Sequence, residues 1–434
     1  MSQFFNLQEC YRMIKRLVMS NKKKFFIFFL IIFLIISFYY KTVIFNKINQ
    51  ILPIGIKSVI KVITSNELSS KKLNNDYNAK FLPKTQFVNL DFKKVKTNIQ
   101  NYNISGYANA LKTKTSTFYI DTHEENLLLF YKNGKSYYSK IYKVNESRLN
   151  LKQIKNNLKN ISVSDILIND SKIYVTGSLK IEKDCNKFTV YESNLNFKNI
   201  EFKKIFQDPN CYGFIQGGRV QYKSKDNSIL VSTAADILKN EIDKKPQDIN
   251  SLMGKIIKID LDNTKNYEIY SLGHRNIIGM HVDGDIILAT ENGPRGGDEI
   301  NLIKKSKNYG WPISSYGEKY KNLNQEEPFY KKSHRDFSFE EPIYSFIPSI
   351  GISEIMKIEN NFTKQWVNNY LIASLYSRHI YRVSFDKEYS KVKYMEKIYI
   401  GERIRDLKYY DDLIFLALEE SNSIGILKMK INDR

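Results

Sequence analysis

The sequence predicts an all-β domain, a propeller or a sandwich, preceded by one N-terminal transmembrane helix. Short apolar runs recur at spacings of roughly 8 to 15 residues, separated by Asn, Asp, Gly or Lys turns. Thirty Tyr, 26 Phe and abundant Ile favour strands. No amphipathic helix of roughly 10 to 15 residues alternates with these runs, which argues against a parallel α/β fold.

Residues 25–45 are the predicted transmembrane segment. Residues 25–40, FFIFFLIIFLIISFYY, carry no charge, and residues 42–45 extend them across a hydrocarbon core of roughly 30 Å. Six basic residues within 1–24 precede the run, so residues 1–24 are expected in the cytoplasm. A cleaved signal peptide is the alternative, although no small-x-small cleavage site follows. We expect a single-pass anchor in the inner (plasma) membrane, with the large domain on the exported, periplasmic side.

A spacer and one large domain are expected after this segment. Residues 46–95 are rich in Lys, Asn and Ser with one short apolar patch, which is typical of a spacer. The strand pattern occupies residues 96–432, about 335 residues, enough for one large β domain. The clearest strands are expected at 117–120, 126–131, 172–176, 228–232, 254–260 and 285–290.

The net charge of +21 could indicate an anionic partner. However, the lysines are spread through every segment beside Asn and Ile, and no DNA- or RNA-binding motif occurs. We therefore expect no nucleic-acid partner. The partner that this part of the sequence implies is the membrane, through the N-terminal helix.

Two of the three cysteines lie after the predicted anchor. Cys185 and Cys211 flank the strand-like runs 188–191 and 199–202, and a hairpin of these runs would bring them together. An exported domain permits a disulfide, which we predict here. Two buried free thiols are the alternative. Cys10 precedes the anchor and is expected in the cytoplasm.

The chain is organised around residues 273–312, GHRNIIGMHVDGDIILATENGPRGGDEINLIKKSKNYGWP. Three Gly and one Pro within 292–298 require turns and predict positive φ at some of the glycines. Such a loop exposes backbone carbonyl and N–H groups, which suit a hard cation or an anionic ligand. A long surface turn is the simpler alternative.

This stretch resembles the soluble quinoprotein sugar dehydrogenases, the glucose/sorbosone dehydrogenase-like β-propellers that use pyrroloquinoline quinone (PQQ) and calcium. The matching segments are GHRN at 273–276, Glu291 with Gly-Pro at 293–294, GGDEINLI at 296–303 and NYGWP at 308–312. The resemblance implies a six-bladed β-propeller with blades of about 55 residues. No sharp internal repeat is visible, so the blade number rests on the family.

The resemblance also implies which residues bind the cofactor. In the family the quinone lies on the top of the propeller, where cations face its carboxylates. Matches to the family's cofactor contacts occur in GHRN, in YGEKY at 316–320 and in RIRD at 403–406: Arg275, Asn276, Tyr320, Arg403 and Arg405. Alternation along a strand would place Arg403 and Arg405 on one face. Arg275 could instead pair with Asp298, and Tyr320 could be a core residue.

Two calcium positions follow from the same resemblance. Gly293 and Pro294 match residues whose carbonyls hold the cofactor-side calcium. Glu299 and Tyr309 match a second position, the glutamate through its carboxylate and the tyrosine through its carbonyl. Oxygen ligands suit calcium. Glu299 could instead cap the turn.

Two departures from the family pattern concern catalysis. The family's histidine base belongs to an H-x-G-G-[RS] motif, and Ile215 stands at its position in FIQGGR, residues 214–219. A lysine that faces the cofactor is replaced by Tyr376 in ASLY, residues 373–376. None of the five histidines matches a catalytic motif, so Asp236 or Asp208 would have to serve as base. Losing a general base costs about 10²–10⁴ in rate.

These observations predict a membrane-anchored PQQ-dependent sugar (aldose) dehydrogenase-like protein with no recognisable catalytic residue. In the family reaction the base takes the proton of a sugar hydroxyl while a hydride from the carbon that carries this hydroxyl passes to the quinone, and whether this chain performs it stays open. The alternative is a non-catalytic, calcium-stabilised propeller that binds a ligand or acts as an interaction module.

Overall fold

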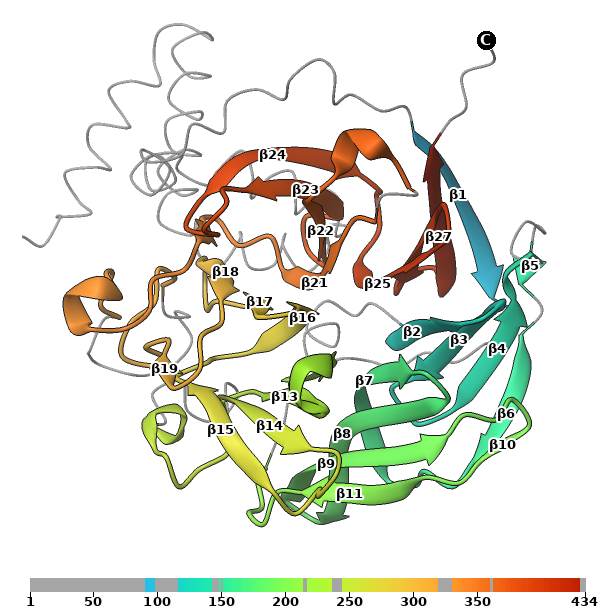
Figure 1. The fold of residues 1–434 in the computed structure, drawn as a ribbon, viewed down its shortest axis with the longest axis horizontal. Coiled ribbons are helices and arrows are strands. Elements are labelled where there is room, and N and C mark those ends of the chain that lie inside the picture. The colour runs from blue at the N-terminus through green and yellow to red at the C-terminus, as the bar shows by residue number, and fades with distance from the viewer. Residues whose placement is uncertain are drawn as a thin grey trace, which may run out of the picture. The chain divides into compact units, whose positions relative to one another are not determined.

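The computed structural model contains a six-bladed β-propeller, which confirms the predicted all-β class and blade number (Figure 1). Each blade is a sheet of four or five strands. The structure describes residues 90–97, 116–142, 148–149, 151–213, 217–235, 244–318, 330–359 and 362–429. The predicted cytoplasmic segment 1–24, the apolar run 25–45 and most of the spacer lie outside these ranges.

Blades 1 to 3 come from the first half of the domain. Blade 1 contains β2 (Phe118–His123), β3 (Asn126–Tyr131), β4 (Ser136–Lys140), β6 (Lys152–Asn156) and β10 (Asn199–Ile200). Blade 2 contains β7 (Ile161–Asn169), β8 (Lys172–Glu182), β9 (Cys185–Asn194) and β11 (Lys203–Gln207). Blade 3 contains β12 (Gly217–Lys223), β13 (Ser228–Thr233), β14 (Lys255–Asp260), β15 (Tyr267–Leu272) and β19 (Lys307–Asn308).

Blades 4 to 6 follow in chain order. Blade 4 contains β16 (Ile277–Asp283), β17 (Ile286–Glu291), β18 (Asp298–Leu302) and β20 (Tyr344–Phe346). Blade 5 contains β21 (Ile352–Lys357), β22 (Asn369–Ser374), β23 (His379–Phe385) and β24 (Val392–Tyr399). Blade 6 contains β25 (Ile404–Tyr410), β26 (Leu413–Leu418), β27 (Ser423–Met429), β1 (Leu90–Thr97) and β5 (Arg148–Leu149). Short 3₁₀ turns lie at Ser224–Asp226, Lys245–Gln247, Arg335–Phe337 and Lys364–Trp366.

The six apolar runs expected as strands are all strands, in β2, β3, β8, β13, β14 and β17. Alternating or continuous apolar residues bounded by turn residues were a sufficient signal, because these strands are mostly buried. In the described part of the chain, no helix is long and apolar enough to cross a membrane.

An N-terminal strand completes the last blade. Strand β1 pairs antiparallel with β27, from Leu90 opposite Met429 to Lys96 opposite Ser423, and Figure 1 shows the two side by side. The propeller therefore begins by Leu90, before the boundary expected at residue 96. The lysine-rich sequence LDFKKVKT buries little more than Val95 and Thr97, so only the distant partner strand reveals this segment as a strand.

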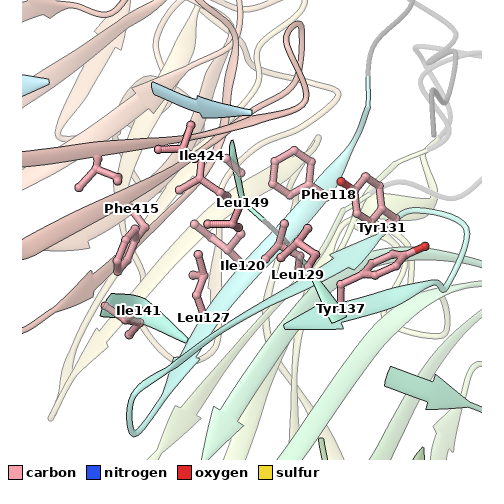
Figure 2. Close-up of a cluster of buried hydrophobic side chains, with 14 residues drawn as sticks. Phe118, Ile120, Leu127, Leu129, Tyr131, Tyr137, Ile141, Leu149, Phe415 and Ile424 are labelled. Atoms are coloured by element: carbon pink, nitrogen blue, oxygen red, sulfur yellow. The ribbon is translucent and has the colours of Figure 1, made fainter. Parts of the chain in front are cut away.

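Apolar clusters between neighbouring blades form the core. Figure 2 shows the cluster between blade 1 and blade 6, where Phe118, Ile120 and Leu129 pack with Phe415 and Ile424. All five side chains are fully buried. This packing joins the first complete blade to the last one, so the ring closes through burial of apolar surface as well as through β1.

The six innermost strands, β2, β7, β12, β16, β21 and β25, contact one another in that order, and β25 contacts β2. Buried carboxylates link them: Asp121 accepts from Ile168 N (2.8 Å), Asp165 from Val220 N (2.9 Å) and Asp406 from Ile120 N (2.9 Å). β7, β12, β16, β21 and β25 each carry a bulge within their first few residues. Bulges are common next to active sites, where they change the direction in which a side chain points.

A disulfide joins Cys185, the first residue of β9, to Cys211, which follows β11, with a Cα–Cα distance of 4.8 Å. The two strands pair antiparallel, and Asn186 forms a further β-bridge with Tyr212. The covalent link therefore restrains the chain immediately before residues 214–216, which carry the family's base position and lie outside the described residues.

Candidate functional site

The GHRN segment connects blades 3 and 4 and is held by buried polar contacts. Gly273 has φ +77°, and an added Cβ would lie 2.1 Å from the Asn308 side-chain oxygen, so glycine is required. The His274 ring is fully buried; it contacts Ser271 Oγ at 2.8 Å and Glu291 Oε2 at 3.1 Å. His274 also stacks on Tyr309, with ring centroids 4.6 Å apart. This histidine fixes the loop and offers no free edge to a substrate.

Arg275 is buried against this framework. Its backbone N–H donates to Glu291, and its Nη1 donates to Asn292 O at 2.9 Å. The guanidinium lies over the Trp311 ring, 5.2 Å from the centroid. Asn276 is buried beside it and donates to Asn292 Oδ1 at 3.4 Å. The adjacent residues Arg275 and Asn276 therefore both contact the loop that begins at Asn292.

Glycines shape that loop as the sequence predicts. Gly296 and Gly297 have φ +92° and +70°. Gly293 has no positive φ, but an added Cβ would lie 2.2 Å from the Gly297 carbonyl oxygen, so close backbone approach requires glycine there. The buried Asp298 carboxylate accepts N–H groups of Gly293 (3.1 Å), Ile350 (2.9 Å) and Ile352 (3.0 Å). Asp298 thus ties the loop to the start of β21.

The carbonyls of Gly293 and Pro294 match the family's cofactor-side calcium position. Within the described ranges, no hydrogen bond ends on either carbonyl oxygen. Uncommitted carbonyl oxygens on a tight loop are suitable ligands for a hard cation. These two residues therefore fit the calcium that the family places beside its cofactor.

Glu291 and Glu299 are directly opposite each other in the β17–β18 pair. Both are buried, with exposures of 4% and 7%, and the Asn301 amide lies between them, 3.5 Å from Glu291 Oε2 and 3.2 Å from Glu299 Oε2. Burial, and then the charge of Glu291, raise the pKa of Glu299 well above its usual range. Two like charges in a buried cross-strand pair are destabilising unless a proton or cation compensates them.

A small cavity of about 10 Å³ lies at this pair, room for about one water molecule or ion. Six of the residues that line it are Arg275, Glu291, Gly293, Glu299, Tyr309 and His334. His334 was not among the residues expected from the sequence, because it matches no family motif and lies in a different loop. Its ring is 2% exposed and stacks on Tyr316.

The expected second calcium ligands meet at this cavity, but the donors around it are mixed. His334 Nε2 lies 3.6 Å from Glu299 Oε1, and in the described part of the chain no group meets the geometry of a hydrogen bond to either ring nitrogen. Burial lowers the pKa of His334 to about 4, so the imidazole is neutral. A neutral imidazole is a poor ligand for calcium, which takes oxygen. The donors at Glu299 and Tyr309 therefore do not match an all-oxygen calcium site.

Arg403 and Arg405 converge on one carboxylate at the start of β25. Arg403 Nε lies 3.1 Å from Glu419 Oε2, and Arg405 Nε lies 2.7 Å from Glu419 Oε1. Although burial alone would raise it, Arg405 and Arg403 lower the pKa of Glu419 to about 2. The two guanidiniums share one negative charge, which leaves one positive charge in excess.

A chain of hydrogen bonds joins these arginines to the GHRN loop. Arg403 Nη1 donates to Leu375 O at 3.3 Å, and Leu375 N donates to Gly351 O at 2.6 Å. The next residue, Ile352, accepts from Asn292 Nδ2 at 3.1 Å. The loops of blades 4, 5 and 6 therefore form one continuous rim at the ends of their innermost strands. Tyr376 lies on this rim, with its N–H bonded to Ile350 O at 3.1 Å.

Lys132 is a further cation at this rim that the sequence reasoning missed. Its N–H donates to Thr117 O at 2.9 Å, and its carbonyl accepts from Val163 N at 2.8 Å, between the starts of β2 and β7. Burial lowers the pKa of the Lys132 ammonium, and the nearby Arg405 lowers it further. The signal in the sequence was weak, because Lys132 occupies an ordinary Lys-Asn-Gly turn in a lysine-rich chain.

Three residues named for the site lie outside the described residues: Ile215, Asp236 and Tyr320. The turn that follows position 215 is described: Gly218 has φ +110°, and an added Cβ would lie 2.4 Å from Ser164 Cβ. The other suggested base, Asp208, is buried and accepts hydrogen bonds from Tyr212 Oη and Asn210 N, both at 2.9 Å. These bonds occupy Asp208 away from the rim loops.

Comparison with known proteins places these motifs in a family. The profile described as glucose/sorbosone dehydrogenase matches residues 116–428. An uncharacterized protein of Synechocystis sp. is 31% identical over 203 residues, 44% of this chain and 48% of the relative. The aldose sugar dehydrogenase YliI of Escherichia coli is 28% identical over 199 residues, 42% and 52% of the two chains. The matched region thus spans about half the length of these curated relatives.

Solved structures extend the likeness over the whole propeller. The soluble aldose sugar dehydrogenase of Escherichia coli in its apo-form matches with a TM-score of 0.60 and 18% identity, covering 79% of this chain and 100% of that one. The PQQ-bound aldose sugar dehydrogenase from Streptomyces coelicolor matches with a TM-score of 0.56 and 16% identity, covering 79% and 99%. At these identities the likeness shows the fold.

Proposed function

Since the chain belongs to the glucose/sorbosone dehydrogenase family, we propose that it is a sugar dehydrogenase-like protein that binds PQQ at the propeller rim. The single observation that carries the proposal is the hydrogen-bonded rim that links Arg275 and Asn276 to Arg403 and Arg405. Guanidinium groups are suited to bind carboxylates, and PQQ carries several. Relatives named as a quinoprotein glucose dehydrogenase and as a PQQ-bound aldose sugar dehydrogenase support the choice of cofactor.

The residues have separable roles in this proposal. Arg403 and Arg405 are held side by side by Glu419, so they are oriented before a ligand arrives. Arg275 is held over the Trp311 ring and against the loop that begins at Asn292. Tyr320, outside the described residues, is assigned a contact with the cofactor through the family match. Lys132 adds positive charge near Arg405.

Bound PQQ would supply a quinone that accepts a hydride from the carbon that carries the sugar hydroxyl. The Gly293 and Pro294 carbonyls are the residues that would hold a calcium ion beside it. A histidine at position 215 would remove the hydroxyl proton, but Ile215 cannot accept one. We therefore propose binding of the cofactor with weak or absent turnover, and Asp236 is the first candidate for a replacement base.

We further propose that residues 25–45 anchor the protein in the inner (plasma) membrane, with the propeller on the exported side. Six basic residues before the apolar run support this orientation. The Cys185–Cys211 disulfide supports an oxidising compartment. Sugars are available there to a propeller tethered at the membrane surface.

A second function is consistent with Ile215 and Tyr376 at the positions of the family's histidine and lysine. The propeller would bind a sugar or another small molecule, or a partner protein, without redox chemistry, and the loop motifs would be retained because they fold the rim. Asp298, which ties the loop to β21, supports this structural role for part of the motif.

Anaerobic titration of the full-length, detergent-solubilised protein with PQQ and calcium separates the two functions. We expect a shift of the quinone absorbance that saturates at one equivalent, followed by little reduction on addition of an aldose. A spectrum that stays that of free PQQ at every protein concentration would exclude the cofactor and leave the binding propeller.

A further inference from the structure

The cross-strand glutamates of blade 4 need a compensating charge. Glu291 has three partners: the His274 ring at 3.1 Å, the Arg275 backbone N–H and the Asn301 amide. Glu299 accepts one hydrogen bond, from Asn301 Nδ2 at 3.2 Å. Because Glu299 is as deeply buried as Glu291 but has fewer donors, Glu299 is the carboxylate that needs a proton or a bound cation.

His334 supplies a second, independent observation at the same place. Its ring is 2% exposed and lines the cavity at Glu299, and among the described residues neither ring nitrogen meets the geometry of a hydrogen bond. A buried imidazole without partners is costly unless a ligand completes it. The Tyr309 carbonyl also faces this ring, outside hydrogen-bonding geometry. Carboxylate, imidazole and carbonyl therefore face a cavity that has room for one ion.

We propose that Glu299, His334 and the Tyr309 carbonyl form a site for a divalent transition-metal ion of the zinc type. Glu291 adds negative charge to the site without being a required ligand. Among the described residues, no group of three or more His, Cys, Asp or Glu side chains is arranged to hold a metal ion. The proposed site agrees with this, because it uses two side chains and one carbonyl, and water completes the coordination.

The distances fit a transition metal. Zinc binds imidazole nitrogen at about 2.0–2.1 Å and carboxylate oxygen at about 2.0–2.2 Å, so two such ligands lie roughly 3 to 3.6 Å apart. Glu299 Oε1 and His334 Nε2 are 3.6 Å apart. Calcium prefers six to eight oxygen ligands, whereas a nitrogen ligand favours zinc, cobalt or nickel. The histidine thus changes the class of ion that this position takes.

The test is metal binding to the full-length protein in detergent, after removal of bound metal with a chelator. A Cys10→Ser background leaves no thiol outside the disulfide. Isothermal titration without PQQ should give one zinc ion per chain, bound at least tenfold more tightly than calcium. Cobalt should give a visible spectrum of a site with a nitrogen ligand. Because no cofactor is present, failure here is distinct from failure of the proposed function.

Substitutions of His334 and Glu299 test whether these two side chains bind the metal ion. His334→Asn and His334→Gln should each weaken zinc binding at least tenfold and remove the preference over calcium at this site, while Glu299→Gln should remove binding of both ions at this site. His123→Asn is the matched control, because His123 is partly exposed and lies 3.9 Å from Glu124. Melting curves of the metal-free variants establish that each one folds.

Three outcomes would overturn the proposal. The first is calcium binding more tightly than zinc to the unmodified site. The second is zinc affinity that His334→Asn and His334→Gln leave unchanged or that His123→Asn removes. The third is no stoichiometric zinc binding to the folded, metal-free protein.

Discussion

Arg219 Nη1 and Glu354 Oε2 lie 2.8 Å apart at the centre of the propeller, although the residues belong to blades 3 and 5. The same Nη1 lies 2.9 Å from Asp165 and 3.2 Å from Asp406, and all four side chains are buried. One guanidinium thus contacts three carboxylates from three other blades, and the ammonium of Lys408 is a second buried cation near them. The family motif that should carry the catalytic histidine ends in this arginine, so Arg219 has a structural role independent of catalysis.

This cluster predicts that the protein loses stability as the pH rises. Burial raises the pKa of Glu354 to about 8, against the opposing effect of Arg219. Between the ordinary pKa of a glutamate, about 4.3, and pH 8, the folded state holds a proton that the unfolded state has released. The free energy of unfolding should therefore fall with rising pH, by at most about 1.4 kcal/mol per pH unit from this group.

Glu354→Gln should flatten this dependence. The amide is neutral at every pH and can still accept the Met280 N–H, which donates to Glu354 Oε1 at 3.2 Å. We expect similar unfolding midpoints for wild type and variant near pH 5, and a higher midpoint for the variant near pH 8.5. Glu125→Gln, at a side chain that is 70% exposed, is the control. Parallel pH profiles for wild type and Glu354→Gln would assign the proton to another group.

Removing one rim arginine should weaken cofactor binding without unfolding the protein. Arg405→Met leaves Glu419 with Arg403 as its partner. A lost charge-assisted contact is worth about 1.5–3 kcal/mol, so the Kd for PQQ should rise roughly 10- to 150-fold. Absorbance titration measures the Kd, and a melting curve separates weaker binding from loss of fold. Lys135→Met, in the turn that follows Lys132, should leave the Kd unchanged.

Restoring the family's residues should restore chemistry. We expect little aldose oxidation by the wild-type protein with PQQ and calcium, and more by Ile215→His combined with Tyr376→Lys. The gained rate should rise with pH as an imidazole deprotonates, near pH 6.5 before any shift by the environment. The Gly217–Gly218 turn after position 215 supports this graft. Robust wild-type turnover would instead point to a base already present, and Asp236→Asn would test that residue.

Membrane topology can be tested in spheroplasts. We expect protease added to intact spheroplasts to digest the propeller, because the basic residues before residues 25–45 hold the N-terminus inside. A cytoplasmic marker protein should survive under the same conditions. Protection of the propeller until the inner membrane is lysed would reverse the orientation.

The sequence determined the class of fold and the family. Short apolar runs predicted β2, β3, β8, β13, β14 and β17, because the period of side chains along a buried strand is local information. The glycines of residues 292–298 predicted positive φ, and Gly296 and Gly297 have it, since steric limits on the backbone are also local. The number of blades was predicted from the resemblance to the family, which the motifs of residues 273–312 carry.

The tertiary structure decided which residues meet. β1 belongs to the propeller only because β27 lies beside it, and a lysine-rich edge strand carries too little apolar pattern to be recognised alone. His334 reaches Glu299 because two loops fold onto one cavity, and Arg219 meets Glu354 because blades 3 and 5 face the same axis. Such contacts depend on ring closure, and no local pattern of residues encodes the position of a distant partner.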